Sequence, residues 1–180
     1  LTTTINSGSL VSHKWEVINS ANVVVSSVVY NSAQEFIYAF NTPGVFRVRL
    51  TSTSDKGCID TLSKSVTVNA LPTVAINSVG YLSQAFHACL GTAHQFTSTG
   101  STAGSGTITN YAWDFGDGGT STVANPTYLY KAVGSYVVTL TIKNSNGCEF
   151  SKTQTVVVDP IPTADIQPAG FPAEVCFGKS

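Results

Sequence analysis

Charged side chains are scarce in this sequence. They make up 11% of its 180 residues, whereas about a quarter is usual for a globular protein. Solubility must therefore rest on the abundant Ser, Thr, Asn and Gly. The 9 Lys and Arg and the 10 Asp and Glu leave a formal net charge of -1, and the cations are scattered along the chain. Without a basic patch, the chain lacks the electrostatic signature of a protein that binds nucleic acid or anionic lipid.

Long apolar runs are missing as well. None approaches the roughly 20 residues that a membrane-spanning helix needs. The first residues carry neither the basic segment nor the apolar core of a secretion signal. Leu1 is not a natural start, and the last residues end inside a strand-like pattern. We therefore expect a segment cut from a longer, secreted chain, with no membrane insertion.

The sequence also lacks the motifs of hydrolases and metal enzymes. It contains no Gly-x-Ser-x-Gly elbow, and no histidine is placed to activate a nucleophile. His87, Cys89 and His94 share one segment, but no Cys-x-x-Cys or His-x-x-x-His pair accompanies them. We predict no catalytic residue, no metal site and no cofactor.

An internal repeat dominates what is present. Residues 42–51 align with residues 132–141 at an offset of 90, and the register continues without a gap. The same offset pairs Tyr38 with Tyr128, Cys58 with Cys148, and Pro72 with Pro162. Near the C-terminus, residues 89–91 match residues 176–178 at an offset of 87. The repeat divides the chain into residues 1–70, whose first strand is truncated, residues 71–160, and the start of a third repeat over 161–180.

The apolar residues within a repeat follow a period of two, as at Tyr136, Val138 and Leu140. This period is typical of strands with one buried face, and turn signals interrupt the strands about every ten residues. No segment has a helical pattern. We predict an all-β protein built of tandem, antiparallel β-sandwich repeats of about 90 residues. The proline-bearing connections at Pro72 and Pro162 predict a semi-rigid rod.

Residues 111–118, with the sequence Tyr-Ala-Trp-Asp-Phe-Gly-Asp-Gly, strongly resemble the hallmark of the PKD (polycystic kidney disease) domain. The resemblance covers about Leu71 to Asp159 and implies an immunoglobulin-like fold. The first repeat keeps a tryptophan, Trp15, but has Glu-Val-Ile-Asn at positions 16–19 in place of Asp-Phe-Gly-Asp. It is therefore a degenerate, PKD-like member. Trp15 and Trp113 are each expected to fill the core of their repeat.

The remaining motif residues have structural interpretations. Gly116 and Gly118 allow φ > 0 in the turn after the tryptophan strand. Asp114 and Asp117 can accept hydrogen bonds from turn amides. A calcium site is the alternative, but it would need six or more oxygen ligands and no Asp-x-Asp-x-Asp-Gly loop is present. We expect the aspartates to stabilise the turn by accepting hydrogen bonds from its backbone amides.

Four cysteines lie at the ends of the repeats. Cys58 and Cys148 follow turns at the upstream end of a repeat, whereas Cys89 and Cys176 precede the second strand at its downstream end. The length of a sandwich, of order 25 Å, is far beyond the reach of a disulfide. We predict that none of the four pairs within this sequence and that each bridges to a neighbouring repeat. An irregular path of residues 81–88 that carries Cys89 back to Cys148 is the alternative.

The flanking elements look most like those of PKD repeats in large secreted Bacteroidetes proteins, including gliding-motility adhesins. This resemblance implies a spacer or adhesive stalk at the cell surface, whose partners are neighbouring repeats of the same chain and surface polysaccharides or proteins. Tyr81, Phe86 and Phe171 are the aromatics that could stack on a sugar. Thr61 lies in an Asp-Thr-Leu sequence that resembles a Bacteroidetes O-glycosylation acceptor. The alternative function is an accessory PKD module of a secreted polysaccharide hydrolase or protease.

Overall fold

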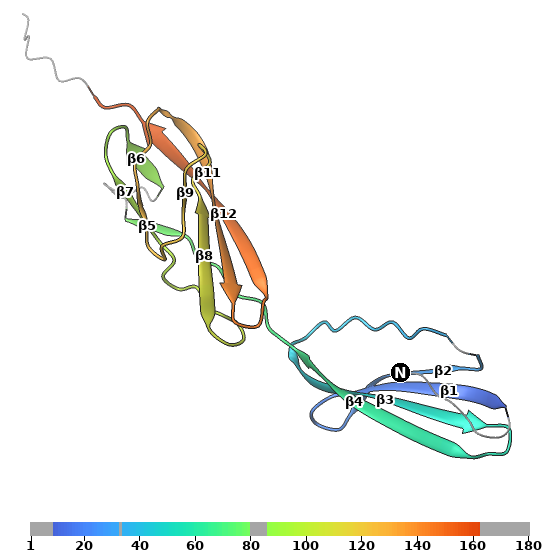
Figure 1. The fold of residues 1–180 in the computed structure, drawn as a ribbon. Helices are drawn as coiled ribbons and strands as arrows, with labels where there is room; N and C mark the ends of the chain where they lie inside the picture. The colour runs from blue at the N-terminus through green and yellow to red at the C-terminus, as the bar shows by residue number, and fades with distance from the viewer. Residues whose placement is uncertain (1–8, 33, 80–85, 163–180) are drawn as a thin grey trace, which may run out of the picture.

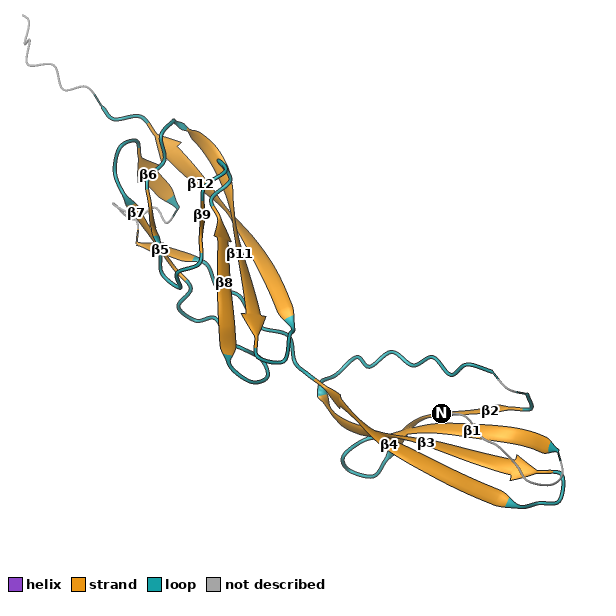
Figure 2. Ribbon diagram, viewed as in Figure 1, coloured by secondary structure: helices purple, strands orange, loops and turns teal. Residues whose placement is uncertain are grey.

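Strands joined by turns and loops make up the described part of the chain. The computed structural model describes residues 9–32, 34–79 and 86–162. Figure 2 shows strands and loops over this part and no helix. No helix in these ranges is therefore long and apolar enough to cross a membrane. The prediction of an all-β fold is confirmed.

The first repeat forms one antiparallel sheet in the order β2-β1-β3-β4. Its strands are β1 (Leu10–Ile18), β2 (Val24–Tyr30), β3 (Gly44–Ser54) and β4 (Ile59–Val68). Residues 34–43, between β2 and β3, form no strand but run alongside this sheet (Figure 1). They bring aromatic side chains to one of its faces.

The second repeat forms two sheets. One has the order β10-β7-β5 and the other the order β6-β12-β11-β8-β9. The strands are β5 (Asn77–Val79), β6 (His87–Cys89), β7 (His94–Thr97), β8 (Ile108–Asp114), β9 (Thr120–Ser121), β10 (Thr127–Tyr128), β11 (Gly134–Asn144) and β12 (Glu149–Asp159).

An apolar core lies between these two sheets. It contains Val74, Ile76, Ala88, Phe96, Trp113, Phe115, Tyr130, Val138, Leu140, Ile142, Val156 and Val158. Of the alternating residues of β11 that the period of two predicted to face inward, Val138 and Leu140 are fully buried and Tyr136 is partly buried. The second repeat is therefore a β-sandwich, as the sequence predicts.

The offset of 90 residues is a structural offset as well. Gly44 pairs with Val68 in the first repeat, and Gly134 pairs with Val158 in the second. The hairpin β3-β4 is thus the counterpart of β11-β12, residue for residue. One pairing departs from the predicted antiparallel arrangement, because β6 runs parallel to β12 over Val157–Asp159.

The first repeat differs from the prediction in having one described sheet instead of two. In the second repeat, residues 77–97 supply β5, β6 and β7, which contribute to the opposing sheet and to the edge beside β12. An offset of 90 places their counterparts at or before residue 7, outside the described residues. Over the described residues the repeat 1–70 forms one sheet, and the second layer of its sandwich stays a prediction.

The two repeats follow one another end to end in Figure 1, joined by a short linker after β4. The linker is held by contacts with the second repeat. The backbone N–H of Ala70 donates to Ser105 Oγ at 2.9 Å, and Pro72 is buried. The connection is thus packed against loops at the upstream end of the second repeat.

Candidate functional site

The turn after β8 holds the residues that the sequence singles out. Asp114 Oδ1 accepts a hydrogen bond from the backbone N–H of Gly116 at 2.9 Å. Asp117 Oδ1 accepts one from the N–H of Gly119 at 3.0 Å and another from Tyr128 Oη at 2.7 Å. A backbone bond from Phe115 N to Gly119 O, 2.9 Å long, closes the turn. Both carboxylates are engaged by the turn, which is the role that the sequence predicts for them.

The two glycines of the motif have different requirements. Gly116 has φ of +84°, and a Cβ atom there would lie 2.7 Å from the carbonyl oxygen of Val137. Gly118 has φ of +92° but faces open space. Gly116 is therefore required by both backbone conformation and close packing, whereas Gly118 is required by conformation alone.

Two tyrosine hydroxyls complete this turn. Tyr130 is buried and its Oη donates to Phe115 O at 3.1 Å, while the Tyr128 ring stacks on Phe115 with 3.8 Å between centroids. Burial raises the pKa of Tyr128 to about 12, and the hydrogen bond to Asp117 adds to this effect. Burial also raises the pKa of Tyr130. These roles were not predicted from the sequence, although the Tyr-x-Tyr spacing places both rings on one side of an extended segment.

The two tryptophans occupy unlike environments. Trp113 is 2% exposed, and its indole N–H donates to Val123 O at 2.9 Å. Trp15 is only half-buried and stacks on Phe36, with 5.4 Å between ring centroids. Trp113 thus lies in a core, whereas the core position of Trp15 stays a prediction, since Trp15 is only partly covered by the described residues. The reason is that the described residues of its repeat supply no second sheet to cover it.

Each repeat nevertheless contains a row of aromatic rings in contact. In the second repeat the row is Trp113, Phe115, Tyr128, Tyr130 and Tyr136. In the first repeat it is Trp15, Phe36, Tyr38, Phe40 and Phe46. Phe36 stands between the tryptophan and the tyrosine where the second repeat has Phe115, although the two phenylalanines come from different parts of the repeat. This substitution explains how the degenerate motif keeps its aromatic row.

The turn of the degenerate motif is also held by hydrogen bonds to a side chain, which here is the amide of Asn19. Asn19 N donates to Val23 O at 2.9 Å, and Asn19 Oδ1 accepts from the N–H groups of Ala21 and Val23. Asn22 takes φ of +60°, at the place that Gly118 occupies in the other turn. The turn therefore does not depend on the aspartate pair.

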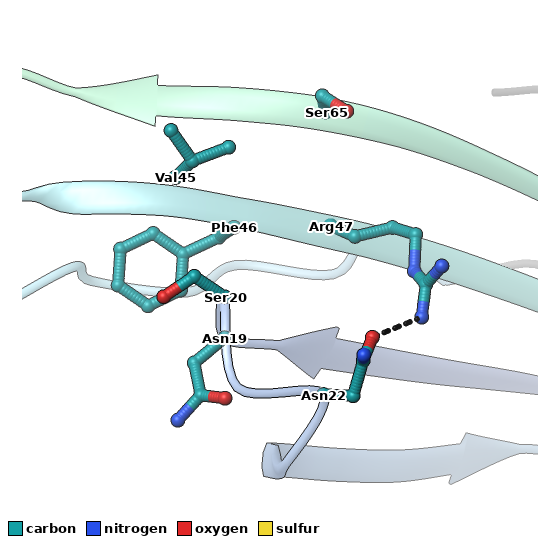
Figure 3. A pocket seen from close by; sticks show the side chains of 7 residues that line it. All are labelled: Asn19, Ser20, Asn22, Val45, Phe46, Arg47 and Ser65. Atoms are coloured by element: carbon teal, nitrogen blue, oxygen red, sulfur yellow. Dashed lines mark hydrogen bonds between the residues drawn. The ribbon is translucent and has the colours of Figure 1, made fainter.

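A shallow hollow lies beside the first-repeat turn (Figure 3). It is lined by Asn19, Ser20, Asn22, Val45, Phe46, Arg47 and Ser65. Figure 3 shows its cation, Arg47, pointing to Asn22, to which it donates a 3.2 Å hydrogen bond. Asn19 is committed to the turn. Arg47 and Asn22 are therefore paired with each other and Asn19 with its own turn, and the geometry indicates no catalytic arrangement in the hollow.

A cluster of charges on β1 and β3 was not foreseen. Glu16 is 4% exposed and lies 2.8 Å from Lys14 Nζ and 2.7 Å from Arg49 Nη2. The hydrogen bond from Lys14, together with Arg49, holds the pKa of Glu16 below its usual value. The signal in the sequence is the alternation of Lys14 and Glu16 on one side of a strand. The cluster is a cross-strand ion pair without a reacting partner.

The histidines are separated by the fold. His87 Nδ1 lies 2.8 Å from Asp159 Oδ2 at the surface. His94 is 4% exposed on β7, stacks edge-on against Phe96, and has its pKa lowered by burial. Over the described ranges, no group of three His, Cys, Asp or Glu side chains could hold a metal ion.

The cysteines lie at opposite ends of the second repeat. Cys89 ends β6 and pairs with Asp159 at the end of β12, whereas Cys148 precedes the first residue of β12. The 11 residues of β12 separate them by about 36 Å. Cys58, Cys89 and Cys148 are free thiols. Cys176 lies outside the described residues, so the bridges predicted between repeats stay a prediction.

The remaining predictions concern the surface aromatics and the glycosylation of Thr61. Phe86 is half-buried against the core of the second repeat, so it is not the exposed aromatic that the sequence suggested. Tyr81 and Phe171 lie outside the described residues. Thr61 is exposed on β4. Its glycosylation stays a prediction, which the intact mass of the native protein would test.

Two sheets packed over a core that includes a buried tryptophan define the second repeat as an immunoglobulin-like β-sandwich. Residues 82–159 match the family model of the PKD domain. This part of the chain is a PKD domain.

Similar proteins are bacterial collagenases and proteases. Collagenase ColQ1 of Bacillus cereus (strain Q1) is 38% identical over 106 residues, which are 59% of this chain and 10% of that protein. The microbial collagenase of Vibrio alginolyticus is 41% identical over 73 residues, 41% of this chain and 9% of that protein. The solved PKD1 domain from the Vibrio cholerae metalloprotease PrtV is 35% identical and covers 49% of this chain and 98% of its own, with a TM-score of 0.42.

The chain thus spans about a tenth of the length of these curated relatives. They come from Bacillus and Vibrio, and they lend no support to the resemblance to Bacteroidetes adhesins. Among the two functions inferred from the sequence, they favour the accessory module.

Proposed function

We propose that this chain is a non-catalytic, extracellular spacer, and that it serves as an accessory PKD segment of a secreted protease or polysaccharide hydrolase. The observation that carries the proposal is the 38% identity to one tenth of a collagenase. The matched segment is one part of a protein named as a collagenase, which is where an accessory module would lie. The rest of such a protein would contain the catalytic unit.

The site geometry is consistent with a spacer. The motif carboxylates bind turn amides and a tyrosine hydroxyl, so they are not available to activate water or a nucleophile. The strongest electrostatic cluster, around Glu16, is an internal ion pair. Each sandwich adds about 35 to 40 Å to the reach of whatever stands beyond it.

A stalk of a surface adhesin is the second candidate, and the tandem repetition favours it. Such a stalk would belong to a chain with many further repeats and no catalytic unit. The sequence on either side of this segment therefore separates the two candidates. A catalytic unit within one or two repeats supports the accessory module, whereas a long array without one overturns it.

Deletion tests the accessory role directly. Residues 1–160 are removed from the full-length protein, and hydrolysis of a short soluble peptide is compared with hydrolysis of collagen fibres. We expect unchanged peptide hydrolysis and slower fibre hydrolysis, because the catalytic unit loses reach toward an insoluble substrate. Two unrelated β-sandwich repeats inserted at the same place serve as the control, and they should restore fibre hydrolysis if length is what matters. Equal loss on both substrates, or no loss on fibres, contradicts the proposal.

A further inference from the structure

The linker between the repeats is held through the backbone of Ala70. Its N–H donates to Ser105 Oγ at 2.9 Å, and its carbonyl oxygen accepts from Asn144 Nδ2 at 3.4 Å. Both polar groups of this linker residue are therefore bound by side chains of the second repeat. A flexible tether would leave them to water.

The side chain of Asn144 makes hydrogen bonds to several segments at this contact. It ends β11, is 1% exposed, and its Nδ2 also donates to Ala103 O at 2.9 Å. Its Oδ1 accepts from the N–H groups of Asn146, at 3.1 Å, and Cys148, at 2.9 Å. The side-chain amide has two donor hydrogens and two acceptor positions, and all four are in use. One buried side chain thus joins three segments, namely the linker, the loop around Ala103 and the turn before β12.

The loop around Ala103 is shaped to receive the linker. Gly104 has φ of +67°, and a Cβ atom there would collide with the backbone carbonyl of Leu71. A second polar contact runs from Asn146 Nδ2 to Asn69 Oδ1 at 3.4 Å. The linker backbone therefore lies directly on the backbone of the second repeat.

The first repeat has the same turn without the amide. Ser54 occupies the position 90 residues before Asn144, and Ser54 Oγ accepts from Cys58 N at 3.2 Å, as Asn144 Oδ1 does from Cys148 N. The backbone bonds of the two turns also agree, since Ser54 N donates to Cys58 O and Asn144 N to Cys148 O, both at 2.9 Å. A serine is therefore sufficient for this turn. The donor amide of Asn144 is needed for something else.

We propose that Asn144 is a positioning residue that fixes the angle between the two repeats, by clasping the linker at Ala70 together with Ser105. The clasp holds the two sandwiches at a fixed angle, so that they behave as one rod at this joint. It does not depend on what the full-length protein acts on, and it would operate in an enzyme accessory and in a stalk alike. The joint therefore has a defined stiffness that one side chain can change.

The test uses the full chain and two variants. Asn144→Ser installs the residue that the first repeat already tolerates in the same turn, and it removes the donor amide. Ser105→Ala removes the acceptor for the Ala70 N–H and leaves the turn untouched. Residual dipolar couplings in solution give the alignment of each repeat, and amide hydrogen exchange reports on Ala70.

In the wild-type chain we expect both repeats to share one alignment and the Ala70 amide to be protected from exchange. In each variant the alignments should diverge, because the repeats then reorient independently. Ala70 protection should fall about fivefold in Ser105→Ala, the change expected for loss of one hydrogen bond.

Ser54→Ala is the matched control, because it removes the turn acceptor of the first repeat, at the end of β3 far along the sheet from the linker. It should leave the common alignment and Ala70 protection unchanged. If Asn144→Ser unfolds the second repeat, Ser105→Ala still decides the matter. A common alignment that survives both changes overturns the proposal, and the contact of Asn146 with Asn69 would then be what holds the joint.

Discussion

At the scale of single residues, the PKD motif is a set of groups that satisfy one another. Asp117 accepts the hydroxyl of Tyr128, and Phe115 is held between a stacked ring and the hydroxyl of Tyr130. A protonated phenol is required for each of these bonds. The pH at which tyrosines ionise is therefore coupled to the stability of the fold.

Tyr128→Phe is expected to weaken the dependence of stability on alkaline pH. Burial raises the folded pKa of Tyr128 to about 12, above the ordinary value of about 10. The unfolded chain therefore releases this proton first. The stabilisation is complete below pH 10 and is lost as the pH rises through the interval up to about 12.

Thermal unfolding followed by circular dichroism between pH 8 and pH 11.5 measures this dependence. The Tm of wild type should fall more steeply than the Tm of Tyr128→Phe. Some slope should remain in the variant, because Tyr130 also has a raised pKa. Tyr111→Phe, which changes a tyrosine outside the turn, is the control and should follow wild type. Equal slopes for wild type and Tyr128→Phe would show that the raised pKa does not contribute.

The burial of His94 predicts that the stability of the fold also falls in acid, in contrast to the loss at alkaline pH that the tyrosines cause. Burial lowers its pKa in the folded state, so the fold favours the neutral imidazole. Its contribution is complete above the ordinary pKa of about 6.5 and is lost as the pH falls through the lower folded pKa. His94→Leu should therefore flatten the fall in Tm of the second repeat between pH 7 and pH 4.5. His87→Gln removes a more exposed imidazole and should not flatten it. A His94→Leu profile parallel to wild type would refute the assignment.

At the scale of elements, the long strands were predictable and the short ones were not. The period of two along β11 follows from its one buried face, so the sequence alone indicated this strand and its buried residues Val138 and Leu140. Strands β9 and β10 have two residues each, too few for any period to show. Their pairing depends on residues far away in the sequence. The parallel contact of β6 with β12 is invisible for the same reason.

The candidate site divides in the same way. The turn roles of Asp114 and Asp117 follow from local chain chemistry, and they were predicted. The place of Phe36 in the first aromatic row depends on the path of the segment between β2 and β3. No local pattern in the sequence indicates this path. The partial exposure of Trp15 depends on which strands cover it, which its own neighbours in sequence do not determine.

The two tryptophans provide a prediction about separate cores. Trp113→Ala should unfold the second repeat and leave the first unaffected, because loss of a buried tryptophan costs about 3–5 kcal/mol and the core cluster around Trp113 contains residues of the second repeat. The chain has 2 tryptophans, one in each repeat, so the fluorescence of Trp15 then reports on the first repeat alone.

Trp15→Ala should cost less than Trp113→Ala, since a half-buried ring loses less contact with its neighbours. Urea unfolding of both variants, followed by fluorescence and circular dichroism, measures this difference. A single transition that shifts as a whole in either variant would show that the repeats unfold as one unit.

At the scale of the whole molecule, the offset of 90 residues predicts that cysteines of adjacent repeats lie near each other. Cys89 pairs with Asp159, and the counterpart of Asp159 in the first repeat is Asn69. Asn69 contacts Asn146, which precedes Cys148 by two residues. A cysteine at the downstream end of one repeat would thus lie close to the upstream turn of the next.

We therefore expect bridges between repeats in the full-length protein. Each bridge forms when two thiols release two electrons and two protons to an external disulfide, which is reduced to two thiols. Peptide mapping of native protein without reductant should find Cys89 and Cys148 linked to cysteines of neighbouring repeats. Quantitative alkylation of Cys58, Cys89 and Cys148 in the unreduced protein would contradict this expectation, and so would a peptide that links Cys89 to Cys148.

The parallel pairing of β6 with β12 has a consequence for a rod that is pulled from its ends. Tension that enters through the linker at Ala70 and leaves after Asp159 first meets the bridge between Thr73 and Thr102 and the pairing of β5 with β7. Once these have given way, β6 and β12 would be drawn in opposite directions along their lengths, because the two strands are parallel. The bonds from Leu90 N to Asp159 O and from Val157 N to Phe86 O, both 2.9 Å long, then bear the load together in shear. Bonds loaded in shear must rupture as a group, whereas bonds at the end of a hairpin open one at a time. The pairing of β6 with β12 would therefore resist such a pull more strongly than a hairpin end of the same length.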